Sequence, residues 1–174
     1  GEPGFNGGGL ARISATQVVL DGRIDVRGEG KEAGDGATDC GGGGGGGVFL
    51  AAEVLRGTGE IDADGGSAHF DGVHGLGAGG GGRIAIHAVD RSAFTGSLHA
   101  FGGILIPLPP PEEKGPIGGA GTVFLKSGSQ VHGDLILDNG GRVQATARTV
   151  LRAVGAGTIQ ALTATTLRGS KTFP

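Results

Sequence analysis

The sequence predicts an all-β protein, specifically a right-handed parallel β-helix (β-solenoid) built from glycine-rich repeats of about 37 residues, with an atypical C-terminal unit. The first observation is the equal spacing of four glycines that each open a short apolar segment, 37 residues apart: Gly22, Gly59, Gly96 and Gly133. The second is composition, because glycine supplies 42 of the 174 residues and most apolar side chains are small or β-branched. The third is an alternation of apolar and polar residues over short segments, which is typical of strands with one buried face.

The first strand of each repeat follows a run of glycines. After a glycine-rich lead-in at residues 1–9, we expect a strand over Leu10–Ala15 with Ile13 facing inward. Equivalent inward positions in the four repeats are expected to stack as one ladder: Ile13, Leu50, Ile86 and Leu125.

The second strand of each repeat begins at one of the four equally spaced glycines. Its inward residues predict a second ladder: Ile24, Ile61, Leu98 and Leu135. Its other face is polar, and Asp25, Asp62 and Asp134 share one position there with His99. One repeat cannot bury two short strands alone, so the repeats must stack.

Longer glycine-rich crossings connect one repeat to the next. Glycine lets backbones approach closely, so we expect these crossings to be packed corners. The third crossing contains the proline-rich piece 107–116, which favours an exposed polyproline II loop.

Two regions follow from the spacing: four two-strand repeats over 1–141 and an atypical terminal unit over 142–174. The terminal unit contains a strand-like segment that comes only 24 residues after Gly133. This unit is expected either to cap the stack or to pair with a neighbouring subunit. The candidate inter-subunit strand comprises Thr158, Ile159, Gln160, Ala161 and Leu162.

Charge and hydropathy exclude several function classes. The net charge is −3 and the 14 basic residues are scattered, so nucleic-acid binding has no electrostatic support. The apolar runs are too short for a membrane-spanning helix, so we expect no membrane insertion. The single Cys40 cannot form an internal disulfide, and the lack of an initiating Met suggests a mature or excised piece.

A family resemblance adds to this interpretation. The phrases GGGGGGGVFLAA, GEIDADGG, GGGGGRIAIHA, GSLHAFGG and GGAGTVFLK resemble the glycine-rich repeats of very large secreted or cell-surface proteins, of adhesin, sheath or filament type. The resemblance covers roughly residues 7–141. It implies an extracellular β-solenoid segment and no shared active site.

Motifs for chemistry are scarce, so we expect no catalytic residue and no cofactor. The phosphate-binding and serine-hydrolase motifs are absent. Acidic groups (Asp62, Asp64 and Asp71, or Asp35 and Asp39) are either solvated carboxylates or ligands for calcium.

The leading hypothesis is a non-enzymatic extracellular or cell-surface structural protein that self-associates into a fibre, sheath or adhesin stalk. One alternative is a carbohydrate-binding or carbohydrate-cleaving β-helix with a surface glycan as partner. Another is a calcium-dependent adhesive module.

Overall fold

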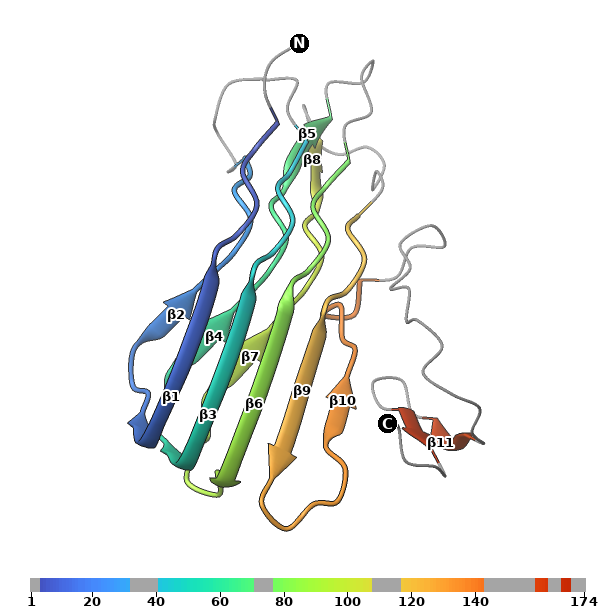
Figure 1. Cartoon of the computed structure of the whole chain (residues 1–174). Helices are drawn as coiled ribbons and strands as arrows, with labels where there is room; N and C mark the ends of the chain where they lie inside the picture. Colours follow the sequence, from blue (N-terminus) through green and yellow to red (C-terminus); the bar gives the residue numbers. More distant parts are fainter. Residues whose placement is uncertain are drawn as a thin grey trace.

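The computed structural model describes residues 4–31, 41–70, 77–107, 117–142, 159–162 and 167–169, and every regular element within these ranges is a β-strand. The first four ranges are called the first to fourth repeats below. The largest sheet contains, in order, β1 (Leu10–Val19), β3 (Gly47–Arg56), β6 (Arg83–Asp90), β9 (Thr122–Ser127) and β10 (Asp134–Ile136). A second sheet lies behind it and contains β2 (Arg23–Asp25), β4 (Glu60–Asp62) and β7 (Ser97–His99) (Figure 1).

Two smaller sheets have two strands each. β5 (Ala68–Phe70) pairs in parallel with β8 (Leu105–Pro107). β11 (Ile159–Leu162) pairs antiparallel with β12 (Leu167–Gly169), so the segment that we considered as an inter-subunit strand pairs within its own chain. Thr158 lies outside the described residues.

Equivalent strands of successive repeats pair in parallel. Along the large sheet, Ile13 lies opposite Leu50, which lies opposite Ile86, which in turn lies opposite Leu125. In the second sheet, Ile24, Ile61 and Leu98 are in register. The hydrophobic core lies between these two sheets, and its largest fully buried side chains are Leu50, Leu55, Ile61, Ile84 and Ile86.

The prediction of a right-handed parallel β-helix is wrong. The large sheet is mixed, because β10 pairs antiparallel with β9, and the strands within the described residues form no closed solenoid. Leu135 therefore lies opposite Phe124 of β9 instead of extending the ladder of the second sheet.

A tight turn joins β9 to β10. β9 ends at Ser127, where the backbone N–H of Gln130 donates to the Ser127 carbonyl and the Ser127 N–H donates to the Gln130 side chain, at 3.0 and 2.8 Å. After this turn β10 pairs with β9 in the same sheet, whereas after the comparable turn in the third repeat, where the Phe94 N–H donates to the Arg91 carbonyl, β7 joins the second sheet.

Glycine segments continue both sheets toward the end of the molecule where β5 and β8 lie (Figure 1). In the segment 41–46, Gly42 and Gly45 donate hydrogen bonds to the next repeat, while Gly43 and Gly46 donate to the segment 26–31 behind them. Hydrogen bonds in each of these two directions thus recur every three residues, which is the period of a polyproline II helix. Gly44, which donates in neither direction here, is exposed.

These glycines are required by close backbone packing. A Cβ on Gly46 would overlap the carbonyl oxygen of Gly9 in the preceding repeat, and Gly82 and Gly121 show the same relation to their preceding repeats. None of the three has a positive φ, so space is the constraint, and backbone conformation is not.

Candidate functional site

The outer face of the second sheet carries a row of ionisable side chains. Its register places Asp25 beside Asp62 and Asp62 beside His99, as the repeat spacing predicts. Asp134 is separated from this row, because β10 belongs to the large sheet.

Two arginines balance the carboxylates of this row. Arg23 donates to Asp62 at 2.5 Å, and Arg27 donates to Asp25 at 2.8 Å. Asp62 is only 4% exposed, and a buried carboxylate is tolerated when it is paired and hydrogen-bonded. The row is therefore an ion-pair network.

The nearest approach to a metal site is the group Glu60, Asp62 and His99, whose candidate ligand atoms lie within 4.8 Å of one another. However, one Asp62 oxygen accepts from Arg23 and the other accepts the backbone N–H of Asp64 at 2.9 Å. A cation would have to displace these donors, so the arrangement favours an ion pair over a metal. Asp35, Asp39 and Asp71, also considered as calcium ligands, lie outside the described residues.

Two carboxyl groups beside this network have shifted pKa values. Burial raises the pKa of Asp64 above its usual value, although the backbone N–H of Phe101 donates to it at 2.6 Å. The hydrogen bonds from Arg27 lower the pKa of Asp25. Asp25 and Asp64 are each hydrogen-bonded to a neighbouring group, so their shifted pKa values do not indicate a catalytic pair of carboxylates.

The outer face of the large sheet has a row of neighbouring rings that are tilted to one another. The Arg12 guanidinium lies 5.3 Å from the centre of the Phe49 ring. The ring centres of Phe49 and His87 are 5.4 Å apart, and those of His87 and Phe124 are 5.5 Å apart. The small Ala85 lies between Phe49 and Phe124 in the register, which leaves room for the imidazole.

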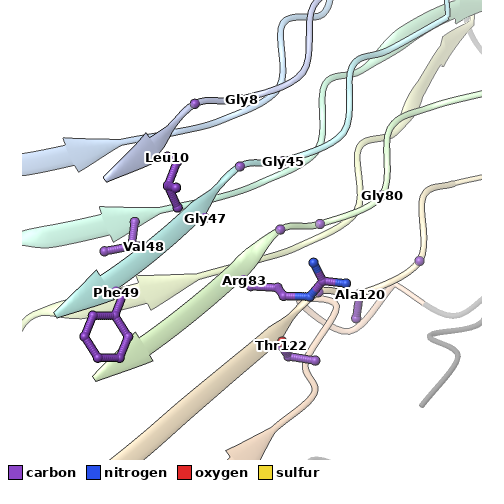
Figure 2. A pocket seen from close by; sticks show the side chains of 16 residues that line it. Gly8, Leu10, Gly45, Gly47, Val48, Phe49, Gly80, Arg83, Ala120 and Thr122 are labelled. Carbon is purple, nitrogen blue, oxygen red and sulfur yellow. The ribbon is translucent and has the colours of Figure 1, made fainter. Parts of the chain in front are cut away.

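A groove of about 1050 Å³ lies beside this row, where the glycine segments join the strands. Its floor is glycine backbone, and side chains of Leu10, Phe49, Arg83 and Thr122 line it (Figure 2). The groove is open and is lined by the Phe49 ring and the Arg83 guanidinium, which are groups that can contact a polar ligand.

The edge of the molecule at the first repeat leaves the core incompletely covered. Ile13, Val18 and Ile24 are partly exposed, whereas their register partners in the second repeat (Leu50, Leu55 and Ile61) are 0% exposed. At the two ends of β1, Leu10 is 82% exposed and Val19 is 51% exposed. The first repeat thus presents apolar surface along β1, whose outer edge pairs with no other strand of the described residues.

The glycine part of the same edge is covered by two polar side chains. The backbone N–H and the side-chain amide of Asn6 both donate to Glu29 Oε2, at 3.3 and 2.9 Å. Among the described residues, none lies within 4 Å of where a Cβ on Gly9 or Gly22, on either side of the strand part, would sit.

The two predicted ladders lie in the two sheets, except that Leu135 lies in the large sheet. The four repeat glycines differ in what an added Cβ would meet. A Cβ on Gly59 or Gly96 would overlap the carbonyl oxygen of the previous repeat's opening glycine, while one on Gly133 would overlap the Phe124 ring.

The two parts of the first-repeat edge were not distinguished from the sequence. Asn6 and Glu29 cover the glycine part, whereas Gly9 and Gly22 in the strand part have open space beside them. A signal existed, since Asn6 and Glu29 occupy positions that are glycine in the later repeats.

No protein-family model, no curated protein and no solved structure matches the chain. A helix long and apolar enough to cross a membrane is absent from the part of the chain that the structure describes.

Proposed function

We propose that this chain is a non-enzymatic structural protein, or a segment of one, that self-associates to build a fibre, sheath or adhesin stalk. It acts outside the cell or at the cell surface. The observation that supports self-association is the open edge of the first repeat, where Ile13, Val18 and Ile24 remain partly exposed.

An unpaired strand edge is a ready template for another chain, and proteins that avoid association usually block it with charges, proline or a covering segment. β1 has one charged side chain, Arg12, and no proline among its ten residues. Complete burial of a side chain such as Leu10 or Val19 contributes about 1.5–3 kcal/mol. The edge therefore has both free backbone groups and apolar area for association.

The ion pairs of the second sheet support a non-enzymatic role. Asp25 and Asp62 are each bonded to an arginine, and a general base must be available to a substrate proton. Support for the location comes from the sequence resemblance to repeats of secreted and cell-surface proteins.

Sedimentation velocity over a range of protein concentrations, together with negative-stain microscopy, tests the proposal. The sedimentation coefficient is expected to rise with concentration, and Leu10→Asp is expected to prevent this rise. Val131→Asp is the matched control, because Val131 is 79% exposed and lies away from the edge strand. A chain that remains monomeric at every concentration would contradict self-association.

A second candidate function is carbohydrate binding, favoured by the open groove beside Phe49 (Figure 2). The groove combines an aromatic side chain, the half-buried Phe49, with the polar group of Arg83, and sugar sites use both kinds of group. A glycan array would show binding that Phe49→Ala abolishes. Calcium-dependent adhesion has weaker support, because the Asp62 carboxylate already accepts a hydrogen bond from Arg23.

A further inference from the structure

The outer face of the large sheet carries cations that no carboxylate neutralises. Three rows of register partners face outward nearest the groove, between rows that are buried in the core. The rows are Leu10, Gly47, Arg83 and Thr122; Arg12, Phe49, Ala85 and Phe124; and Ser14, Ala51, His87 and Lys126. They contain three cations, Arg12, Arg83 and Lys126, and no Asp or Glu. Within the described residues none of the three forms an ion pair, and Arg12 lies over the Phe49 ring instead.

The arginines of the second sheet have the opposite surroundings. Arg23 donates to Asp62 and Arg27 donates to Asp25, so these charges are neutralised within the chain. A protein with a net charge of −3 thus leaves several of its cations together and unpaired on one face. Such a surface attracts an anionic ligand.

The groove of about 1050 Å³ at the end of this face crosses all four repeats. Its floor contains one equivalent glycine from each repeat, namely Gly9, Gly46, Gly82 and Gly121. Neighbouring strands in a sheet lie about 4.8 Å apart. A linear ligand in the groove would therefore meet the same backbone groups once per repeat, at a spacing close to the length of one sugar residue in an extended glycan chain.

The groove also has unused hydrogen-bond donors. Gly80 and Gly119 line it, and their carbonyls accept from the N–H groups of Gly45 and Gly81 at 2.8 and 2.9 Å. Their own N–H groups donate to no described residue. N–H groups near a guanidinium suit a carboxylate, because hydrogen bonds to a charged oxygen are shorter and stronger than those between neutral groups.

We propose that this groove binds an acidic polysaccharide, whose sugars carry carboxylate groups. Arg83 pairs with a carboxylate of the ligand, and Thr122 on the neighbouring strand bonds to a hydroxyl group (Figure 2). The N–H groups of Gly80 and Gly119 donate to further oxygen atoms, and the other two cations of the face add long-range attraction. The inference rests on the second candidate function, carbohydrate binding, since it names the class of carbohydrate.

Two other anionic partners fit the same surface less well. A second copy of this chain would have to present the acidic face of its second sheet, where Asp25 and Asp62 are already bonded to arginines. A single-stranded nucleic acid stacks its bases on exposed rings, but Phe49 is half-buried and lies beneath the Arg12 guanidinium. An acidic polysaccharide needs no open ring face, because cations and hydrogen-bond donors recognise its carboxylates and hydroxyls.

Fluorescence anisotropy of a labelled oligogalacturonate, titrated with the full chain at low ionic strength, tests the proposal. The methyl ester of the same oligosaccharide is the matched neutral ligand, because it differs only in its methylated carboxyl groups. We expect the acid to bind and to lose affinity as salt is added, since salt screens charges at an open surface. The ester is expected to bind at least about tenfold more weakly, which is the effect of losing one hydrogen bond to a charged group.

Arg83→Gln locates the site, and Arg56→Gln is its matched control. Both arginines are exposed and each change removes one charge, but Arg56 ends β3 about 30 Å from Gly47, at roughly 3.3 Å per residue. Arg83→Gln is expected to weaken binding of the acid by about tenfold. Arg56→Gln is expected to weaken it by less than about twofold, because the distance exceeds the screening length. Circular dichroism spectra equal to that of the unchanged chain establish that both variants are folded.

The possible failures separate the class of ligand from the site. Equal binding of the acid and its methyl ester would overturn the acidic class and leave carbohydrate binding standing. Equal losses in Arg83→Gln and Arg56→Gln would overturn the groove as the site. Tighter binding of a labelled oligothymidylate would identify a nucleic acid as the occupant and overturn the proposal. Failure to bind all three ligands would overturn both this inference and the second candidate function, whereas self-association is measured separately by sedimentation.

Discussion

The glycine packing predicts unequal losses of stability for one substitution at two equivalent positions, Gly46→Ala and Gly9→Ala. At Gly46 the new Cβ would overlap the Gly9 carbonyl oxygen and would lie 2.7 Å from the Gly8 carbonyl carbon and 2.8 Å from the Val26 oxygen. All three are backbone atoms, so no side chain can rotate away, and overpacking of this kind costs about 1–3 kcal/mol.

The displaced backbone would also weaken two hydrogen bonds, from the Gly46 N–H to Val26 and from the Arg83 N–H to Gly46, at 2.8 and 2.9 Å. Each contributes about 1 kcal/mol. We therefore expect Gly46→Ala to reduce the free energy of unfolding by about 3–5 kcal/mol. Gly9 has open space beside it and no positive φ, so Gly9→Ala is expected to change stability by less than about 1 kcal/mol.

Urea denaturation monitored by circular dichroism, at one low concentration for all variants, measures both effects. For a chain of this length, the loss at Gly46 corresponds to a decrease in Tm of about 6–20 °C. Gly59→Ala and Gly22→Ala are a second matched pair, because a Cβ on Gly59 would overlap the carbonyl oxygen of Gly22, whereas a Cβ on Gly22 would meet nothing within 4 Å. Equal effects within both pairs would refute the reasoning that backbone contact between repeats is what requires glycine.

Three further predictions concern the ion-pair network. Arg23→Gln leaves the buried Asp62 carboxylate with weaker partners and is expected to reduce the free energy of unfolding by about 1–3 kcal/mol in urea denaturation, a range kept low because Arg23 is 40% exposed; an unchanged midpoint would contradict it. Since the pKa of Asp64 is raised in the folded state, its charged form opposes folding above the ordinary pKa of about 4 and not below it. Asp64→Asn is therefore expected to stabilise the protein at pH 7 and not at pH 3, and a gain of the same size at both pH values would argue against burial as the cause. Because Asp62 is already bonded to Arg23, a chelator such as EDTA is expected to leave the Tm unchanged, and a clear decrease would indicate a bound metal.

The regular spacing of glycines accounts for much of the fold. It places Ile24, Ile61 and Leu98 in one register, and the similar spacing of the first strands aligns Ile13 with Leu50. Repeats that are equal in length bring equivalent residues together, so a spacing in the sequence translates directly into a register between strands.

The end of the repeat pattern was not predictable in the same way. Gly133 keeps the 37-residue spacing, yet β10 pairs with β9 in the large sheet, whereas the second strands of the first three repeats pair with one another. Spacing fixes how far apart residues are along the chain, but it does not fix which neighbouring strand supplies the hydrogen-bond partners.

The candidate site was predicted only in part. The shared position of Asp25, Asp62 and His99 follows from the repeat, but their pairing with Arg23 and Arg27 depends on side-chain reach across and along strands. The importance of the first-repeat edge emerges only when equivalent positions are compared for what lies beside them, as with Gly9 and Gly46.

The glycine segments have a consequence for the temperature dependence of stability. They are held together by peptide hydrogen bonds and bury little apolar side-chain area. Exposure of apolar surface raises the heat capacity of unfolding and exposure of peptide groups lowers it. The heat-capacity change of unfolding per residue is therefore expected to lie below the value of about 12–15 cal/mol/K that is usual for globular proteins. Such a protein has a flatter stability curve, and it retains more of its maximum stability both in the cold and on moderate warming.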